Sequence, residues 1–154
     1  MLTIERVAIL RSLDLFRDTP DYILSSVARI IEELSLRPGD TLITEGEYGA
    51  CMYIIVEGSM RVHSQGQKII HLEAGSIVGE LAILDPEPRT ASVTAIDDSF
   101  LFKIDKEPFD EVLADRPEIA LGVIRTLSRK VRAQGRRLAK LAPADPEQHQ
   151  LDSP

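Results

Sequence analysis

Residues 78–93 read VGELAILDPEPRTASV and interrupt a series of short strand-like segments. Between two apolar stretches they place a glycine, one short helical turn and a loop with two prolines. Gly79 permits a tight backbone turn, and the first N–H groups of a turn that begins at Glu80 are unpaired donors suited to an anion. Arg89 offers a planar guanidinium that matches phosphate geometry, while the Glu80 carboxylate accepts hydrogen bonds from hydroxyls. Together these residues predict a pocket for a phosphorylated sugar.

The segment lies inside a region, residues 35–105, whose spacing is that of β-strands. Residues 60–63 alternate between apolar and polar, and Gln65-Gly66 is a two-residue hairpin turn before the return strand. Residues 100–105 alternate in the same way, which predicts one buried side. Short strands at this turn spacing predict a compact sandwich or barrel.

Helical spacing flanks the β region on both sides. Residues 1–34 predict two helices with a break at residues 18–20. In residues 106–142 the helical period returns, and after Arg116-Pro117 it continues as a long helix over residues 118–141. We expect a single domain over residues 1–142. The proline-rich polar segment 143–154 is interpreted as a disordered tail.

The long helix carries an apolar seam whose members follow alternating steps of four and three. They are Ala120, Ile124, Leu127, Val131, Leu138 and Leu141, with the polar Gln134 in the remaining slot. Such a seam predicts a coiled coil, and hence a homodimer through the helix 118–141. The alternative is that the helix packs on its own barrel. A second apolar pair, Ile119 and Val123, lies off the seam and is expected to face the β region.

The composition is that of an ordinary globular protein, with 44% of the 154 residues hydrophobic and 28% charged. The longest apolar run, residues 51–56, is far shorter than the roughly 20 residues that a membrane-spanning helix needs. The first residues lack the basic start and apolar stretch of a secretory signal. Cys51 is the single cysteine, which excludes an internal disulfide. We therefore expect a cytoplasmic protein without membrane insertion.

The formal charge of -7 is unevenly distributed along the chain. Residues 111–142 hold eight basic and three acidic residues, whereas residues 1–110 hold 10 basic and 19 acidic ones. We interpret the basic stretch as a solvated helix face, with contact to nucleic acid or to an acidic partner as the alternative.

The order and spacing of Gly-Glu-Leu-Ala at residues 79–82 and Pro-Arg-Thr-Ala-Ser-Val at residues 88–93 resemble the phosphate-binding cassette of the cyclic-nucleotide-binding domain family. This module occurs in the regulatory subunits of cyclic-AMP-dependent protein kinase, in cyclic-nucleotide-gated channels and in the catabolite activator protein. The resemblance covers roughly residues 1–140. It implies an α+β, mainly β fold: an antiparallel, jelly-roll-like β-roll flanked by N-terminal helices and by the C-terminal B and C helices.

The resemblance also implies a function, namely a non-catalytic module that senses cAMP or cGMP and couples binding to movement of the C-terminal helix. Arg89 then pairs with the exocyclic phosphate oxygens, and Glu80 accepts the ribose 2′-hydroxyl. Gly79, Leu81 and Ala82 would present backbone N–H groups and form the close wall of the pocket. Thr90 and Ala91 would line the side of the phosphate and the base. A hydroxyl residue after the arginine favours cGMP in some relatives, but some cAMP binders share it, so Thr90 leaves the base open. Candidates for the lid over the base are Ile124, Leu127, Val131 and Gln134.

Two other classes of protein remain as alternatives. One is a ligand-free interaction or dimerisation domain of a larger regulatory or transport system. The other is a cupin-like metalloenzyme that uses His63 and His71. A turn at Gln65-Gly66 places His63 opposite Lys68 and His71 opposite Met60, so the histidines are not cross-strand neighbours. We therefore expect no metal, no prosthetic group and no enzymatic activity, and the short segment after the long helix predicts no direct nucleic-acid binding.

Overall fold

The computed structural model describes residues 1–141, apart from the side chains of Lys68 and Ile69, and the predicted tail 143–154 lies outside the described residues. The helices are α1 (Thr3–Arg11), the 3-10 helix η1 (Asp14–Phe16), α2 (Asp21–Ala28), α3 (Glu80–Leu84), α4 (Lys106–Asp115) and α5 (Pro117–Leu141). The strands are β1 (Glu32–Leu36), β2 (Thr41–Ile43), β3 (Tyr48–Gly49), β4 (Cys51–Glu57), β5 (Ser59–Ser64), β6 (Gln67–Glu73), β7 (Ile77–Val78), β8 (Glu87–Pro88), β9 (Ser92–Ala95) and β10 (Ser99–Asp105).

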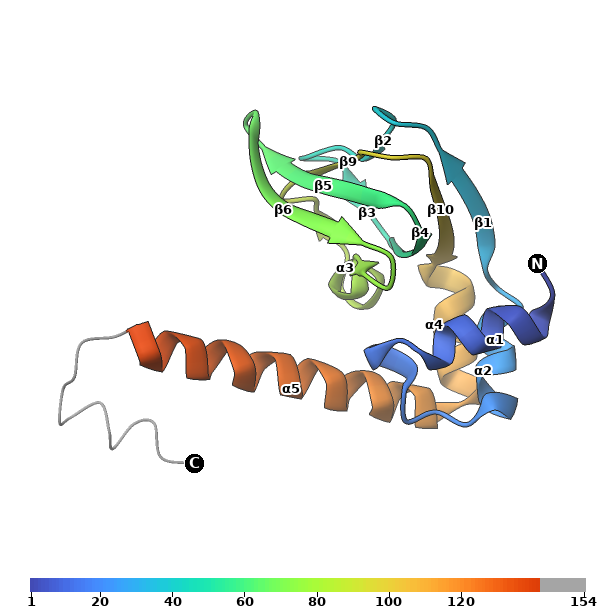
Figure 1. The fold of residues 1–154 in the computed structure, drawn as a ribbon. Helices are drawn as coiled ribbons and strands as arrows, with labels where there is room; N and C mark the ends of the chain where they lie inside the picture. The colour runs from blue at the N-terminus through green and yellow to red at the C-terminus, as the bar shows by residue number, and fades with distance from the viewer. Residues whose placement is uncertain (142–154) are drawn as a thin grey trace, which may run out of the picture.

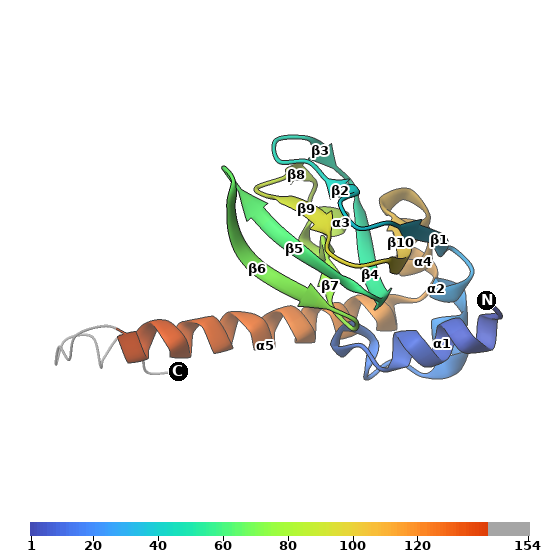
Figure 2. The same ribbon diagram turned by 45° about the horizontal axis from the view of Figure 1, so that its top comes forward.

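The strands form an antiparallel β-roll with helices at one end (Figure 1). One four-stranded sheet has the order β1-β10-β4-β7, the other has the order β2-β9-β5-β6, and β3 and β8 form a short ribbon. The helices α1, α2 and α4 gather beside β1 and β10, and α5 runs below the roll (Figures 1 and 2). This arrangement confirms the predicted β-roll with helices before and after it.

Strands β4 and β10 are buried on both faces and separate two apolar clusters. Ile54 and Phe102 belong to a cluster shared with the helices, whereas Ile55 and Leu101 belong to the cluster inside the roll. The prediction of a single buried side for residues 100–105 was therefore wrong. Both Leu101 and Phe102 are 0% exposed, because the helices cover the face of β10 that would otherwise meet water.

The first strand begins earlier than the predicted boundary between residues 34 and 35. Helix α2 ends at Ala28, and β1 occupies residues that were assigned to the helical segment 1–34. The apolar spacing of Ile31 and Leu34 fits a helix, but β1 pairs along its whole length with β10, with Leu34 opposite Leu101. Pairing with β10 gives the backbone N–H and C=O groups of this segment hydrogen-bond partners, and this pairing outweighs the preference for a helix that the apolar spacing indicates.

The β5–β6 hairpin has the predicted two-residue turn. Gln65 and Gly66 both have positive φ, 53° and 80°, as the tight turns that match strand twist require. His63 pairs with Lys68 as predicted, but a bulge between Val62 and His63 moves the partner of His71 from Met60 to Arg61. The two histidines remain separated along the ladder.

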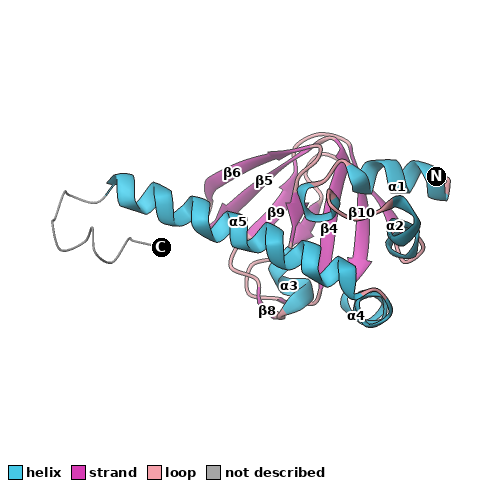
Figure 3. Ribbon diagram, turned by 90° about the horizontal axis from the view of Figure 1, so that it is seen from below, coloured by secondary structure: helices cyan, strands magenta, loops and turns pink. Residues whose placement is uncertain are grey.

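The buried side chains of helix α5 lie in its first half. Ile119 and Val123 are buried in the cluster that the helices share with β4 and β10, and α5 contacts η1 and α4. The Thr126 hydroxyl donates to the Asp14 carbonyl of η1 at 3.2 Å. Viewed from below, the rest of α5 crosses beneath the strands and past α3 (Figure 3). Within the described residues, no helix has both the length and the apolar character needed to cross a bilayer.

Candidate functional site

A cavity of about 610 Å³ opens between α3, the loop after β8 and strands β5 and β6. Its volume is in the range of small-molecule pockets. Its wall includes all seven residues that the sequence singled out: Gly79, Glu80, Leu81, Ala82, Arg89, Thr90 and Ala91. Apolar side chains of the roll, such as Val62 and Leu72, form the opposite wall. The cavity is therefore apolar on the strand side and polar on the cassette side.

Gly79 is required at its position by both conformation and space. Its φ of 87° lies in the left-handed region, and it caps α3 by accepting a bond from the Ile83 N–H at 3.1 Å. A Cβ at this position would lie 2.8 Å from the Cys51 carbonyl oxygen and 2.9 Å from Nη1 of Arg89. Glycine therefore allows α3 to start in contact with β4 and with Arg89.

The Arg89 guanidinium lies in a cradle between Gly79 and Gly49. Nη2 donates to the Cys51 carbonyl oxygen at 3.1 Å and lies 3.6 Å from the Cys51 thiol sulfur. The Arg89 backbone is held by two bonds of 2.8 Å, one from its N–H to the Glu47 carbonyl and one from the Gly46 N–H to its own carbonyl. The β3–β8 ribbon thus positions Arg89 in the cavity wall.

Among the described residues, no carboxylate forms an ion pair with Arg89, whose side chain is half-buried. Apart from the bonds to Cys51, the guanidinium N–H groups of Arg89 have no protein acceptor among the described residues. Partial burial of a cation costs desolvation free energy, and pairing with an anion offsets this cost. The electrostatics of the cavity therefore favour an anionic ligand at Arg89.

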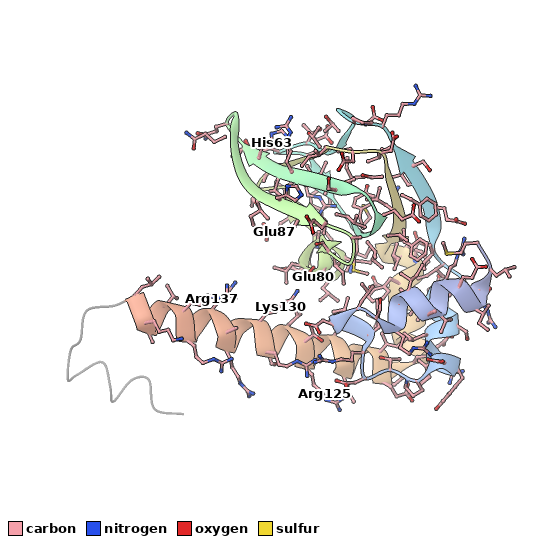
Figure 4. All side chains as sticks on the ribbon, in the orientation of Figure 1. His63, Glu80, Glu87, Arg125, Lys130 and Arg137 are labelled. Carbon is pink, nitrogen blue, oxygen red and sulfur yellow. The ribbon has the colours of Figure 1, made fainter. Side chains whose placement is uncertain are left out.

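Glu80 is the first residue of α3 and lies at the side of the cavity that faces α5. Its Oε1 accepts a hydrogen bond from the Lys130 ammonium at 2.5 Å, and the Glu80 side chain is only 17% exposed. Figure 4 shows Lys130 reaching from α5 toward Glu80. The ion pair connects the C-terminal helix to the predicted cassette.

None of the four lid candidates lines the cavity. Ile124 and Val131 are 57% and 67% exposed, on a face of α5 that the described residues leave uncovered. Three residues of the site could not be predicted from the sequence. Lys130 contacts Glu80 from α5, and Gly49 and Cys51 form the cradle of Arg89. Their distance from the cassette along the chain left no local pattern to reveal them.

The remaining predicted site residues differ in exposure. Leu81 is 65% exposed at the mouth of the cavity, Thr90 is exposed, and Ala91 is half-buried. Ile83, two residues after Leu81 and therefore on the opposite face of α3, is buried and joins the helical cluster. The short helix α3 therefore places Leu81 at the mouth of the cavity and Ile83 in the core.

Within residues 1–141 no group of three or more histidine, cysteine, aspartate or glutamate side chains gathers in a metal-binding arrangement. His63 instead lies 2.8 Å from the Thr94 hydroxyl through its Nε2 atom. Among residues 1–141 the cupin-like alternative therefore lacks a ligand set of this kind.

The fold and the cavity define a β-roll domain with one cavity wall that carries the Arg89 guanidinium and the Glu80 carboxylate. The family model described as the cyclic nucleotide-binding domain matches residues 33–116, and the chain belongs to this family. The chain is 29% identical over 138 residues to a CRP-like cAMP-activated global transcriptional regulator of Mycobacterium tuberculosis. That match covers 86% of this chain and 62% of the regulator, so the chain spans less than two thirds of its relative.

Two solved structures have the same fold. The N-terminal domain of a transcriptional regulator from Streptomyces coelicolor A3(2) has a TM-score of 0.78 and 29% identity, over 90% of this chain and 99% of that one. The cAMP-bound PfPKA-R (141–441) has a TM-score of 0.72 and 25% identity, over 90% of this chain and 47% of that one. The fold of this chain is therefore that of the cyclic-nucleotide-binding β-roll.

Proposed function

We propose that this chain is a non-catalytic sensor module that binds cAMP or cGMP in the cavity and transmits binding through α5. The observation that carries the proposal is the cradle of Arg89, a half-buried guanidinium that pairs with no carboxylate of the described residues. A cyclic phosphate would supply the missing counterion, and two charge-assisted bonds to it contribute about 1.5 to 3 kcal/mol each.

The ligand orientation follows from the two polar ends of the cavity. The exocyclic oxygens of the phosphate lie at Arg89, and the ribose 2′-hydroxyl donates to the Glu80 carboxylate. Gly79, Leu81 and Ala82 contribute the close backbone wall, whose N–H groups precede the first helical bond of α3. Thr90 and Ala91 line the side toward the base, with the apolar strand wall opposite. The CRP-like regulator is named for cAMP, and a cGMP-dependent protein kinase of Caenorhabditis briggsae, 38% identical over 80 residues, is named for cGMP, so both nucleotides are candidate ligands.

Coupling to α5 is supported by the contrast between the two halves of this helix. Its first half is held by buried Ile119 and Val123, whereas Lys130, further along, contacts the cassette directly. A ligand that binds Glu80 therefore changes the Lys130 contact in the outer half of α5, while the buried Ile119 and Val123 keep the first half in place. The output is a change in the position of the outer half of α5, which is a shift between two populations of the domain.

We further propose a homodimer through the seam of α5. Four seam side chains are open to water, at 57% for Ile124, 67% for Val131 and Leu138, and 82% for Leu141, whereas Ala120 and Leu127 are half-buried and Leu127 packs against the core. Apolar residues at this heptad-like spacing are stabilised by packing against a second helix. A second copy supplies such a helix. The alternative is a ligand-free interaction domain in which this seam is the functional surface.

The free thiol of Cys51 fits a reducing compartment, and we place the module in the cytoplasm. We assign no direct nucleic-acid contact to this domain and interpret the basic face of α5 as solvated. The ligand is exchanged reversibly, and no prosthetic group is needed for sensing.

The test is titration of the full chain with a fluorescent cyclic-nucleotide analogue, displaced in turn by cAMP, cGMP and linear 5′-AMP. We expect displacement by a cyclic nucleotide, loss of binding in Arg89→Ala, and unchanged binding in Arg37→Ala, which removes an exposed arginine that does not line the cavity. Equal affinity of the wild type and Arg89→Ala would refute the site. Absence of binding by the wild type would favour the ligand-free alternative.

A further inference from the structure

The ion pair between Lys130 and Glu80 occupies a group that the proposed ligand also needs. The ammonium nitrogen lies 2.5 Å from Oε1 of Glu80. The Glu80 side chain is 17% exposed and the Lys130 side chain 48%, so the contact is shielded on the carboxylate side and open to water on the ammonium side. Figure 4 shows Lys130 directed at the cassette, whereas Arg125 lies on the opposite side of α5.

Lys130 lies beyond the part of α5 that the core holds. The preceding contacts of the helix go to the N-terminal segment: Thr126 to the Asp14 carbonyl, and Arg129 to Asp18 at 3.8 Å. Among the ion pairs of the described residues, Lys130–Glu80 is the one furthest along α5. This pair links α5 to the cassette just beyond the part of the helix that is held by buried side chains.

A charged ammonium and a neutral hydroxyl are unequal partners for a carboxylate. A hydrogen bond from an ammonium to a carboxylate is shorter and about twice as strong as one between neutral groups. The ammonium contacts Oε1, so a ribose hydroxyl that approaches Glu80 either shares the carboxylate with Lys130 or displaces the ammonium to water. The exchange lowers the net free energy that the ligand gains at Glu80.

We propose that Lys130 competes with the ribose 2′-hydroxyl for Glu80 and thereby holds the ligand-free domain in a state of lower affinity. The proposal rests on the function proposed above, since it concerns the same cavity. Lys130 is then an affinity-determining residue of the site. Ligand binding then weakens the ion pair between Lys130 and Glu80.

The opposite role for Lys130 predicts the opposite result. If the ammonium orients Glu80 for the ligand, removal of the charge weakens binding. If the pair is only a surface contact, removal changes nothing, because exposed ion pairs contribute about 0.2 to 1 kcal/mol to stability and are screened by salt. A substitution of Lys130 therefore separates three mechanisms by the sign of one measured change.

The experiment compares the full-length wild type with Lys130→Met, which keeps an unbranched side chain and removes the charge. The matched control is Arg125→Met, which removes one positive charge from the opposite side of α5. Each protein is titrated with cAMP, cGMP and their 2′-deoxy analogues by calorimetry. The analogues lack the hydroxyl for which Lys130 competes, so they separate competition at Glu80 from a general change in charge.

We expect Lys130→Met to bind the 2′-hydroxyl nucleotide about two- to fivefold more tightly, with the 2′-deoxy analogue and the Arg125→Met control unchanged. In a Glu80→Gln background the Lys130 substitution should have no effect, as a double-mutant cycle requires of two groups acting through one contact. If Lys130→Met binds the 2′-hydroxyl nucleotide with the same affinity as the wild type or more weakly, the competition is refuted. The same holds if the affinity for the 2′-deoxy analogue rises equally. Both outcomes leave the proposed function intact. If the wild type binds neither nucleotide, the proposed function fails and this inference fails with it.

Discussion

Gly49 and Arg89 are in such close contact that a Cβ at residue 49 would lie 2.2 Å from Nε of Arg89. The φ of Gly49 is not positive, so glycine is needed here for space and not for backbone conformation. Gly49 belongs to β3 and pairs with Glu87 of β8, two residues before the arginine. The β3–β8 ribbon therefore holds the guanidinium against a surface that only glycine provides.

This relationship predicts that Gly49→Ala displaces Arg89 and weakens nucleotide binding. Loss of one charge-assisted bond to phosphate corresponds to roughly a ten- to hundredfold increase in Kd. The fold should be retained, because alanine tolerates the backbone conformation. The measurement is calorimetric titration, with Gly135→Ala as the control, because a Cβ at that exposed helical position meets no atom within 4 Å. Unchanged affinity in Gly49→Ala would contradict the cradle.

Thr90 lies at the exposed edge of the cavity on the side proposed for the base. We predict that Thr90→Ala lowers the affinity for cGMP more than that for cAMP, because a hydroxyl after the arginine contacts guanine in some relatives. Thr90→Ser should retain the wild-type ratio, since it keeps the hydroxyl. The check is the ratio of the two Kd values measured by competition. An equal ratio in wild type and Thr90→Ala would show that the base is selected elsewhere.

Tyr53 should make the protein sensitive to alkaline pH. Burial raises the pKa of its phenol above the ordinary value, and the neighbouring Cys51 raises it further. Because the folded state holds this proton more tightly than the unfolded state, the stabilisation is complete below the unfolded pKa of about 10 and is lost as the pH rises above it. We expect Tyr53→Phe to show a smaller loss of unfolding free energy between pH 9 and pH 11.

Urea titrations at a series of pH values measure this difference. Tyr22→Phe is the matched control, since Tyr22 is 69% exposed. The same alkaline loss in Tyr53→Phe and in the wild type would assign the effect to other groups.

The seam of α5 should determine the oligomeric state. We predict that the wild type sediments with twice the monomer mass of 17.1 kDa and that Val131→Glu sediments as a monomer. An acidic side chain in an apolar helix interface is costly because it must be desolvated without a partner. Arg136→Glu places the same side chain on another face of the helix and should leave the dimer intact. A monomeric wild type at high concentration would contradict the proposed interface.

Much of the cassette could be predicted from the sequence because its parts are local. The turn at Gly79, the short helix α3 and the proline-rich loop before Arg89 follow from preferences that act over a few residues. All seven predicted site residues line one cavity because the two motifs border a single short excursion between strands. The β-roll and the flanking helices were predictable for a similar reason, since the hydrophobic period changes at each boundary.

Where local preferences compete with sheet pairing, sequence reasoning was wrong. Residues 32–34 have helical spacing and form part of β1, because pairing with β10 satisfies their backbone. The bulge at Val62 and His63 likewise shifted the partner of His71 by one residue. Both outcomes depend on strands that are distant along the chain, and no window of sequence contains that information.

The order of residues alone determined the class of fold, the cassette and the presence of a long amphipathic C-terminal helix, because periodicity and turn chemistry act between near neighbours. Only the tertiary structure decided which distant groups complete the site. The space at Gly49 and the Cys51 carbonyl that hold Arg89, and the Lys130 ammonium on Glu80, come from other strands and from α5. Contacts of this kind are set by how the strands and α5 pack in three dimensions, and packing joins residues regardless of their separation in sequence.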